Sequence, residues 1–188
     1  MDIKGKIIET LREINREGID DLIGAMEEGR FFEAPCSGAN HLAKEGGLAE
    51  HSLNVYYGMI ELDKALKADL PYDSIVICSL LHDLGKMGDH GKPNYVENIL
   101  KSGKRSDSKP YTTNSNLIYL PHELRSSMIA QRYIRLTEDE EAAIVWHNGL
   151  YGPFKYDIPG KETPLYMVLH WADMWASRVV EDEGGEEE

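Results

Sequence analysis

The residues best suited to chemistry lie in one short stretch, Ser79-Leu80-Leu81-His82-Asp83-Leu84-Gly85-Lys86. A histidine and an aspartate stand side by side at the end of an apolar run, and a lysine follows shortly after. Neighbouring helical residues point about 100° apart, so His82 and Asp83 can contact one ion that lies between them. On a continued helix, Lys86 would return to the side of His82. Imidazole, carboxylate and ammonium together suit a divalent metal ion with a phosphate beside it.

Other residues elsewhere in the chain offer the same kinds of donor atom. The full set of candidate metal ligands is His51, His82, Asp83, His122, His147 and Asp173. Each lies on a predicted helix or at its edge, and only the 82–83 pair shares one. Five helices could therefore bring polar side chains to one pocket, as helical-bundle metal sites do. Nitrogen and carboxylate donors suit Mn²⁺, Fe²⁺, Zn²⁺, Ni²⁺ or Co²⁺ and disfavour Ca²⁺.

The elements that must position these residues are mostly helices. Apolar residues at helical spacing, bounded by glycines, prolines and capping residues, predict helices over residues 3–14, 21–28, 48–66, 74–83, 122–133, 138–147 and 164–179. The long irregular section that follows Lys86 is expected to hold a small hairpin formed by residues 94–100 and 111–119. The sequence therefore predicts an all-α bundle in a single domain, residues 1–180. The acidic residues 181–188 are expected to form a disordered tail.

Composition narrows the class of protein and its partners. The 188-residue chain is 41% hydrophobic and carries a net charge of −13, which argues against broad binding to duplex DNA. No apolar run reaches the roughly 18 residues of a membrane-spanning helix, so no membrane partner is expected. Cys36 and Cys78 are too few for a disulfide framework, and a reducing cytoplasm fits best. Any anionic substrate must therefore meet positive charge locally.

The ligand pattern resembles that of the HD-domain metal-dependent phosphohydrolase superfamily. Its minimal signature is a His, a His-Asp pair and a distant Asp, matched here by His51, His82-Asp83 and Asp173. His122 and His147 stand where binuclear branches of that superfamily carry two further histidines. The matching local phrases are Gly46-Gly47-Leu48-Ala49-Glu50-His51-Ser52, Leu81-His82-Asp83-Leu84-Gly85-Lys86, Trp146-His147-Asn148-Gly149 and Ala172-Asp173-Met174. The resemblance covers about residues 31 to 180 and implies an HD-domain helical bundle.

The same resemblance implies phosphoester hydrolysis at a centre that holds two ions in its full form. Asp83 would bridge the ions, with His51, His82 and Asp173 on one and with His122 and His147 on the other. A water between the ions would lose a proton near neutral pH and attack phosphorus in line. Lys86 would offset the charge that develops on the phosphate. Asp83 and Lys86 are therefore the predicted catalytic residues.

Four residues are candidates for substrate contact: Lys86, Arg125, Trp146 and His41. Arg125 follows a predicted ligand on the same helix, and His41 would lie at the rim of the pocket. Trp146 could stack on a base, although aromatic residues in such positions more often pack in the core. The basic residues between 92 and 109 would hold a polyphosphate or a single strand, or form a solvated loop.

The expected substrate is a small phosphorylated molecule, a nucleotide or a short oligonucleotide. The Gly46-Gly47 lead into His51 resembles the HD module of bacterial 3′–5′ exoribonucleases, which usually carry an OB-type domain that has no room here. A 3′–5′ exonuclease, a cyclic-nucleotide phosphodiesterase and a non-catalytic nucleotide-binding sensor stay open as alternatives. The oligomeric state also stays open, a homo-oligomer included.

Overall fold

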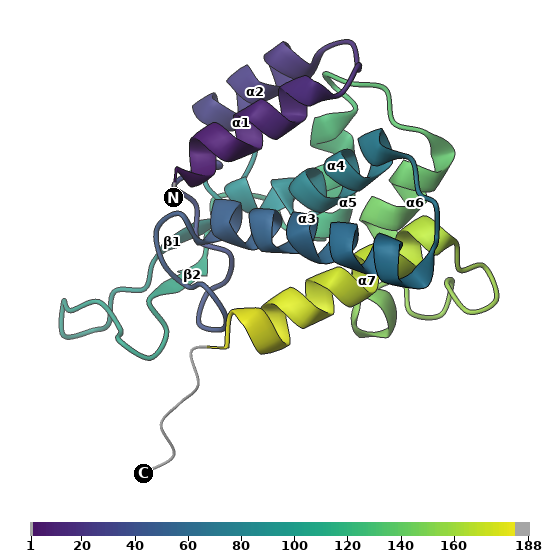
Figure 1. The fold of residues 1–188 in the computed structure, drawn as a ribbon. Coiled ribbons are helices and arrows are strands. Elements are labelled where there is room, and N and C mark those ends of the chain that lie inside the picture. The colour runs from purple at the N-terminus through teal and green to yellow at the C-terminus, as the bar shows by residue number, and fades with distance from the viewer. Residues whose placement is uncertain (1, 183–188) are drawn as a thin grey trace.

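A computed structural model describes residues 2–182 of the chain. Over this range seven α-helices surround a shared apolar interior, and strands occur only as one two-stranded hairpin (Figure 1). The helices are α1 (Ile3–Glu13), α2 (Ile19–Glu28), α3 (Gly47–Leu66), α4 (Tyr72–Leu81), α5 (His122–Ala130), α6 (Glu138–Trp146) and α7 (Pro164–Trp175). The predominantly helical class predicted from the sequence is therefore confirmed. None of the described helices has the length and apolar character needed to cross a bilayer.

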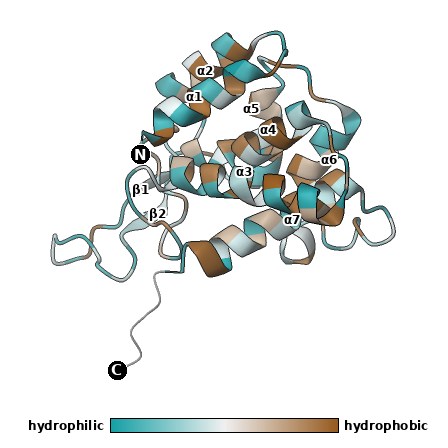
Figure 2. Cartoon of the chain, viewed as in Figure 1, coloured by the Kyte–Doolittle hydropathy of each residue, from teal (hydrophilic) through white to brown (hydrophobic). Residues whose placement is uncertain are grey.

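The interior is built around α3 and α4. Every residue from Ser74 to Leu81 of α4 is buried, so this helix has neighbours on all sides. Figure 2 shows α4 largely in the colour of hydrophobic residues, in contrast to the mixed faces of α1 and α2. Helix α7 packs along α3 and against α6 (Figure 1). Since each buried Leu or Ile side chain contributes roughly 1.5–3 kcal/mol, this interior holds the polar ends of the helices in place.

Two helix starts follow local capping rules that the sequence makes visible. The Thr137 hydroxyl accepts a hydrogen bond from the Glu140 amide at 3.2 Å, and the Glu140 carboxylate accepts one from the Thr137 amide at 2.8 Å. This pair is the predicted capping box of α6. The Thr163 hydroxyl caps α7 by accepting a hydrogen bond from the Tyr166 amide at 3.3 Å, with Pro164 in the first helical position. Both predicted starts are confirmed.

The predicted hairpin is present but shorter than expected. Strand β1 (Tyr95–Glu97) pairs antiparallel with β2 (Tyr111–Thr113), and Tyr95 lies opposite Thr113. The loop that joins the strands extends away from the helices (Figure 1). Its lysines, Lys101, Lys104 and Lys109, are exposed.

Three helices end two or more residues earlier than the sequence predicts. Helix α4 ends at Leu81, and the chain tightens into a 3₁₀ turn, η1 (Leu84–Met87). Helix α5 ends at Ala130, three residues early. Helix α7 gives way to a π-helical turn, η3 (Ala176–Val180). Propensity does not distinguish these tighter and wider turns from a regular helix, because each keeps a local hydrogen-bonded ladder.

The first residue of the predicted acidic tail, Glu181, is packed in the structure. Glu181 is buried, with 6% of its surface exposed, and it contacts residues far away in the sequence. Asp182 is exposed. The rest of the predicted tail, 183–188, lies outside the described residues.

Asp89 fastens the base of the hairpin to the end of α5. Arg132 donates two hydrogen bonds of 2.8 Å to the Asp89 carboxylate, and Arg125 lies 3.4 Å from it. The hydrogen bonds from Arg132 outweigh burial and lower the pKa of Asp89 from 3.8 to about 2. The ionised carboxylate therefore stabilises the folded state.

We expect Asp89→Asn to lower the free energy of unfolding at pH 7 by about 1–2 kcal/mol. The effect is no larger because solvent around the exposed part of Arg132 screens the ion pair. The folded-state pKa lies below the unfolded value of 3.8, so the contribution is complete above about pH 5 and is lost as the pH falls toward 2. Urea unfolding should therefore show the difference from wild type shrinking by roughly half at pH 3. The exposed Asp107→Asn is the control, and an unchanged difference at pH 3 would contradict the assignment.

Candidate metal centre

The six predicted ligands lie together in the interior, although their positions run from 51 to 173. They form one group, hereafter the His/Asp cluster: His51, His82, Asp83, His122, His147 and Asp173. His51 Nε2 lies 3.2 Å from Asp173 Oδ1 and 3.3 Å from His82 Nε2. Asp83 Oδ2 lies 3.4 Å from His82 Nε2 and 3.6 Å from His51 Nε2. This half of the cluster is almost closed to solvent.

Asp83 joins that half to the two remaining histidines. Asp83 Oδ1 lies 3.2 Å from His122 Nε2 and 3.5 Å from His147 Nε2. The side chain of His122 is 29% exposed, whereas those of Asp83 and His147 are buried. The cluster therefore opens toward solvent at His122.

Helix ends supply most of these side chains. His82 and His147 are the C-terminal caps of α4 and α6, and His122 is the first residue of α5. His51 lies in the second turn of α3, and Asp173 lies in the last turn of α7. Because each element has its own apolar face in the shared core, packing these helices together also brings their polar ends together.

Backbone carbonyl groups fix the ring orientation of two of the histidines. His82 Nδ1 lies 2.9 Å from the Ser79 carbonyl oxygen, and His147 Nδ1 lies 2.7 Å from the Ile144 carbonyl oxygen. Since a carbonyl oxygen only accepts, each Nδ1 carries a proton and donates it, and each Nε2 faces the cluster. His51 Nδ1 likewise faces an acceptor, a buried carboxylate. Such outer contacts are typical of histidines that bind metal ions.

The turn after Asp83 differs from the prediction for Lys86. A 3₁₀ turn has three residues per turn, so Lys86 returns to Asp83 and not to His82. Its Nζ donates to Asp83 Oδ2 at 2.6 Å. A Cβ atom on Gly85 would lie 2.5 Å from the His122 carbonyl oxygen. Only glycine allows η1 and α5 to approach closely enough for His122 to reach Asp83.

Asp83 is charged and incompletely satisfied. Burial alone would raise the pKa of this carboxyl, but Lys86 and the surrounding imidazoles hold it well below its usual range. The same ion pair raises the pKa of Lys86 against the effect of burial. Asp83 Oδ1 lies 3.2 Å from His122 Nε2 and 3.5 Å from His147 Nε2, and it makes no hydrogen bond with these or other groups in residues 2–182. A buried carboxylate oxygen without a donor is an open position for a cation.

His82 and His51, which both lie in the half that is almost closed to solvent, have different electrostatic environments. Burial lowers the pKa of His82, and Asp83 offsets this only in part. For His51, the effect of burial is outweighed by Cys36, Asp173 and Glu181, which raise its pKa well above 6.5. His82 is therefore held neutral, as a metal ligand must be, whereas His51 would release a proton when an ion binds.

The donor set fits a divalent metal ion. Within the cluster, three overlapping groups of three residues have donor atoms within 4.8 Å of one another. These groups are His51, His82 and Asp83; His82, His147 and Asp173; and Asp83, His122 and His147. Buried His/Asp groups of this composition could hold a metal ion.

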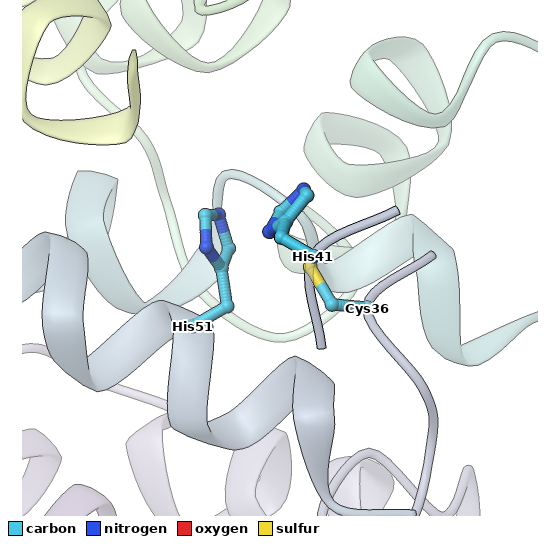
Figure 3. Close-up of side chains that lie close together, drawn as sticks. All are labelled: Cys36, His41 and His51. Atoms are coloured by element: carbon cyan, nitrogen blue, oxygen red, sulfur yellow. The ribbon is translucent and has the colours of Figure 1, made fainter. Parts of the chain in front are cut away.

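Of the residues predicted to contact substrate, two border the cluster. Lys86 does so through Asp83. The ring of His41 lies 5.0 Å from that of His51, between centroids, and Figure 3 shows both rings beside the sulfur of Cys36. His41 Nδ1 also lies 2.6 Å from the Glu181 carboxylate. His41 is thus placed behind a cluster residue, on the side away from Asp83.

The other two are engaged elsewhere. Arg125 is buried and donates to the Ile118 carbonyl oxygen at 2.7 Å, at the base of the hairpin. Trp146 packs edge to face against Tyr166, with 6.1 Å between ring centroids. Within the part of the chain that the structure describes, both side chains make contacts of a structural kind.

Sequence reasoning missed three residues that contact the site. The Asn148 amide nitrogen lies 3.2 Å from Nε2 of both His122 and His147, and its place directly after His147 was a usable signal. Cys36 is buried, with its sulfur 3.8 Å from Lys86 Nζ. Glu181 gave no signal, because it begins an acidic run whose members look alike.

A cavity of about 810 Å³ adjoins the cluster on one side. It lies between α2, the loop after α2 and the hairpin, and its walls include Arg30, Glu33, Lys86, Tyr95 and Arg132. Lys86 thus lines the cavity and contacts Asp83, whereas no member of the His/Asp cluster lines it among the described residues.

Comparisons of the chain with protein-family models, with curated proteins and with solved structures found no match. The functional interpretation therefore depends on the geometry of the His/Asp cluster and on the cavity beside it.

Proposed function

We propose that this protein is a divalent-metal-dependent phosphohydrolase of the HD-domain class that cleaves a phosphoester of a nucleotide or short oligonucleotide. One observation carries the proposal. Three buried imidazoles direct Nε2 toward two aspartates, and Asp83 Oδ1 among them lacks a hydrogen-bond donor in residues 2–182. A cation stabilises imidazole nitrogens and carboxylates that converge in a buried site, and it displaces the protons they carry.

The cluster residues divide into two halves that share Asp83. His51, His82 and Asp173 would hold one ion, and His122 and His147 would hold the other. A bound divalent ion supplies a water with a pKa near 7 and polarises phosphoryl oxygens. Asp83 would fix the two halves relative to each other, because one of its carboxylate oxygens faces each half.

Lys86 would bind the phosphate. Lys86 lines the cavity and its ammonium group contacts Asp83, so it would hold an anion between the two while the rest of the substrate occupies the cavity. A volume of about 810 Å³ falls in the range of roughly 300–1,000 Å³ that is typical of small-molecule sites. Tyr95 on the cavity wall offers an aromatic ring, and Arg30 offers positive charge. These features support a nucleotide more than a long polymer.

A 3′–5′ exonuclease is the second candidate, and the hairpin is the observation that favours it. Lys101, Lys104 and Arg105 are exposed in its loop, and Arg105 lies over the Tyr111 ring at 4.5 Å from the centroid. A basic loop with an aromatic ring can hold a single strand.

Elemental analysis of the purified protein and a substrate panel test the proposal. The panel contains nucleoside mono- and triphosphates, cyclic dinucleotides and short RNA, each assayed with Mn²⁺. We expect bound divalent metal and hydrolysis of a nucleotide phosphoester that a chelator abolishes and Mn²⁺ restores. Mononucleotide release from RNA without action on free nucleotides would favour the exonuclease. Metal-loaded protein that binds nucleotides without turnover would indicate a sensor, and protein that takes up no metal would refute the proposal.

A further inference from the structure

Glu181 lies behind the His/Asp cluster and contacts three side chains. Both of its carboxylate oxygens lie 3.0 Å from His51 Nδ1, and Oε2 lies 2.6 Å from His41 Nδ1. Asn54 donates a hydrogen bond to Oε1 at 3.0 Å. The side chain is only 1% exposed. A carboxylate buried this completely needs such donors, which lower the pKa of Glu181 to about 2 against the effect of burial.

The C-terminal part of the chain holds His51 from both sides. Asp173 in the last turn of α7 faces Nε2 of His51 at 3.2 Å, and Glu181 faces Nδ1. Between them the chain forms the π-helical turn η3, whose last hydrogen bond joins the Glu181 amide to the Ala176 carbonyl oxygen at 2.9 Å. Turns of this kind often occur at functional sites, because they redirect one side chain without ending the helix. Here the redirected side chain is Glu181.

We propose that Glu181 is the positioning residue for His51. Its carboxylate would keep the proton on Nδ1, orient the ring and increase the basicity of Nε2 toward a metal ion. This inference rests on the proposed metal centre. The carboxylate partner of Nδ1 distinguishes His51 from His82 and His147, whose Nδ1 atoms face neutral carbonyl oxygens.

A second metal site around Cys36 is the competing interpretation. Donor atoms of Cys36, His41 and His51 lie within 4.8 Å of one another (Figure 3). However, His51 Nε2 faces Asp173, and its Nδ1 is occupied by the Glu181 carboxylate. His51 therefore has no free nitrogen for an ion on the side of Cys36, and the geometry favours an outer-shell role for the residues there.

Mn²⁺ titration of metal-stripped, full-length protein tests the role of Glu181. The variants are Glu181→Gln, which keeps the shape and an acceptor oxygen, and Glu181→Ala, which removes both. Asp182→Asn is the matched control, because it neutralises the exposed neighbouring residue. Loss of an outer-shell partner costs about 10–100-fold in metal affinity, so we expect about 10-fold for Glu181→Gln and up to about 100-fold for Glu181→Ala. Asp182→Asn should bind as wild type does.

A spectroscopic readout separates positioning from simple packing. Wild-type and Asp182→Asn proteins loaded with diamagnetic Zn²⁺ should show a hydrogen-bonded imidazole Nδ1–H proton signal that Glu181→Ala lacks. Wild-type Mn²⁺ affinity in Glu181→Gln would overturn this inference and leave the metal centre intact. Absence of Mn²⁺ binding by wild-type protein would refute the metal centre and this inference together. Glu181→Gln decides the matter if Glu181→Ala fails to fold.

Discussion

Asp83→Ala is expected to remove bound metal and to lower phosphoester hydrolysis by about 10³-fold or more. The reason is the central place of this carboxylate, whose oxygens lie within 3.6 Å of four imidazoles. No other member of the His/Asp cluster contacts both halves through separate oxygens. Elemental analysis and activity assays on the same preparation measure both effects.

Stability complicates that substitution and suggests its control. Removing Asp83 leaves the Lys86 ammonium without its partner, and breaking a buried ion pair costs about 3–5 kcal/mol. The double variant Asp83→Ala/Lys86→Met removes both charges and should recover much of the loss without recovering metal or activity. Circular dichroism should show a retained fold in the double variant. An active Asp83→Ala protein would exclude the proposed chemistry.

Lys86→Met alone is expected to lower kcat by about 10²-fold with the metal content retained. Lys86 is the one predicted site residue on the cavity wall that also contacts the cluster, so its loss removes positive charge where phosphate would bind. A bound ion would still neutralise Asp83, which explains why metal should remain. Steady-state kinetics together with elemental analysis measures the two quantities separately.

Lys92→Met is the matched control for charge. Lys92 lines the same cavity but donates to the Asn116 carbonyl oxygen at 2.9 Å in an exposed position. This variant should change KM slightly and leave kcat unaffected. Loss of metal in Lys86→Met in proportion to its loss of activity would show that Lys86 acts only through Asp83.

Much of the helical framework was predictable because its signals are local. The Thr137 capping box and the Thr163-Pro164 start depend on residues within one turn of each other. The central position of α4 was equally predictable, because a helix with no polar face must be buried on all sides. The proximity of His51 to Asp173 was predictable for another reason, namely a recognisable order of residues whose helices all face one core.

The remaining features depend on contacts between distant segments. The sequence predicted phosphate binding for Arg125, but its partners are Asp89 and the Ile118 carbonyl oxygen, on a long loop without regular pattern. Glu181 is one of several similar acidic residues, and its burial is decided by His41 and His51 more than a hundred positions earlier. The turn at Lys86 was assigned the wrong partner because a 3₁₀ turn and an α-helix share the same local composition.

The close approach of Gly85 to α5 has a consequence for protein engineering. Gly85, in the spacer between the His-Asp pair and Lys86, cannot be replaced by a residue with a side chain. Even a methyl group at this position would clash with the His122 carbonyl oxygen. Variation is easier on the cavity wall, which includes the exposed Lys92 and, among the described residues, none of the proposed metal ligands. Libraries aimed at new substrates should therefore vary the cavity wall and keep the spacer and the six cluster residues as they are.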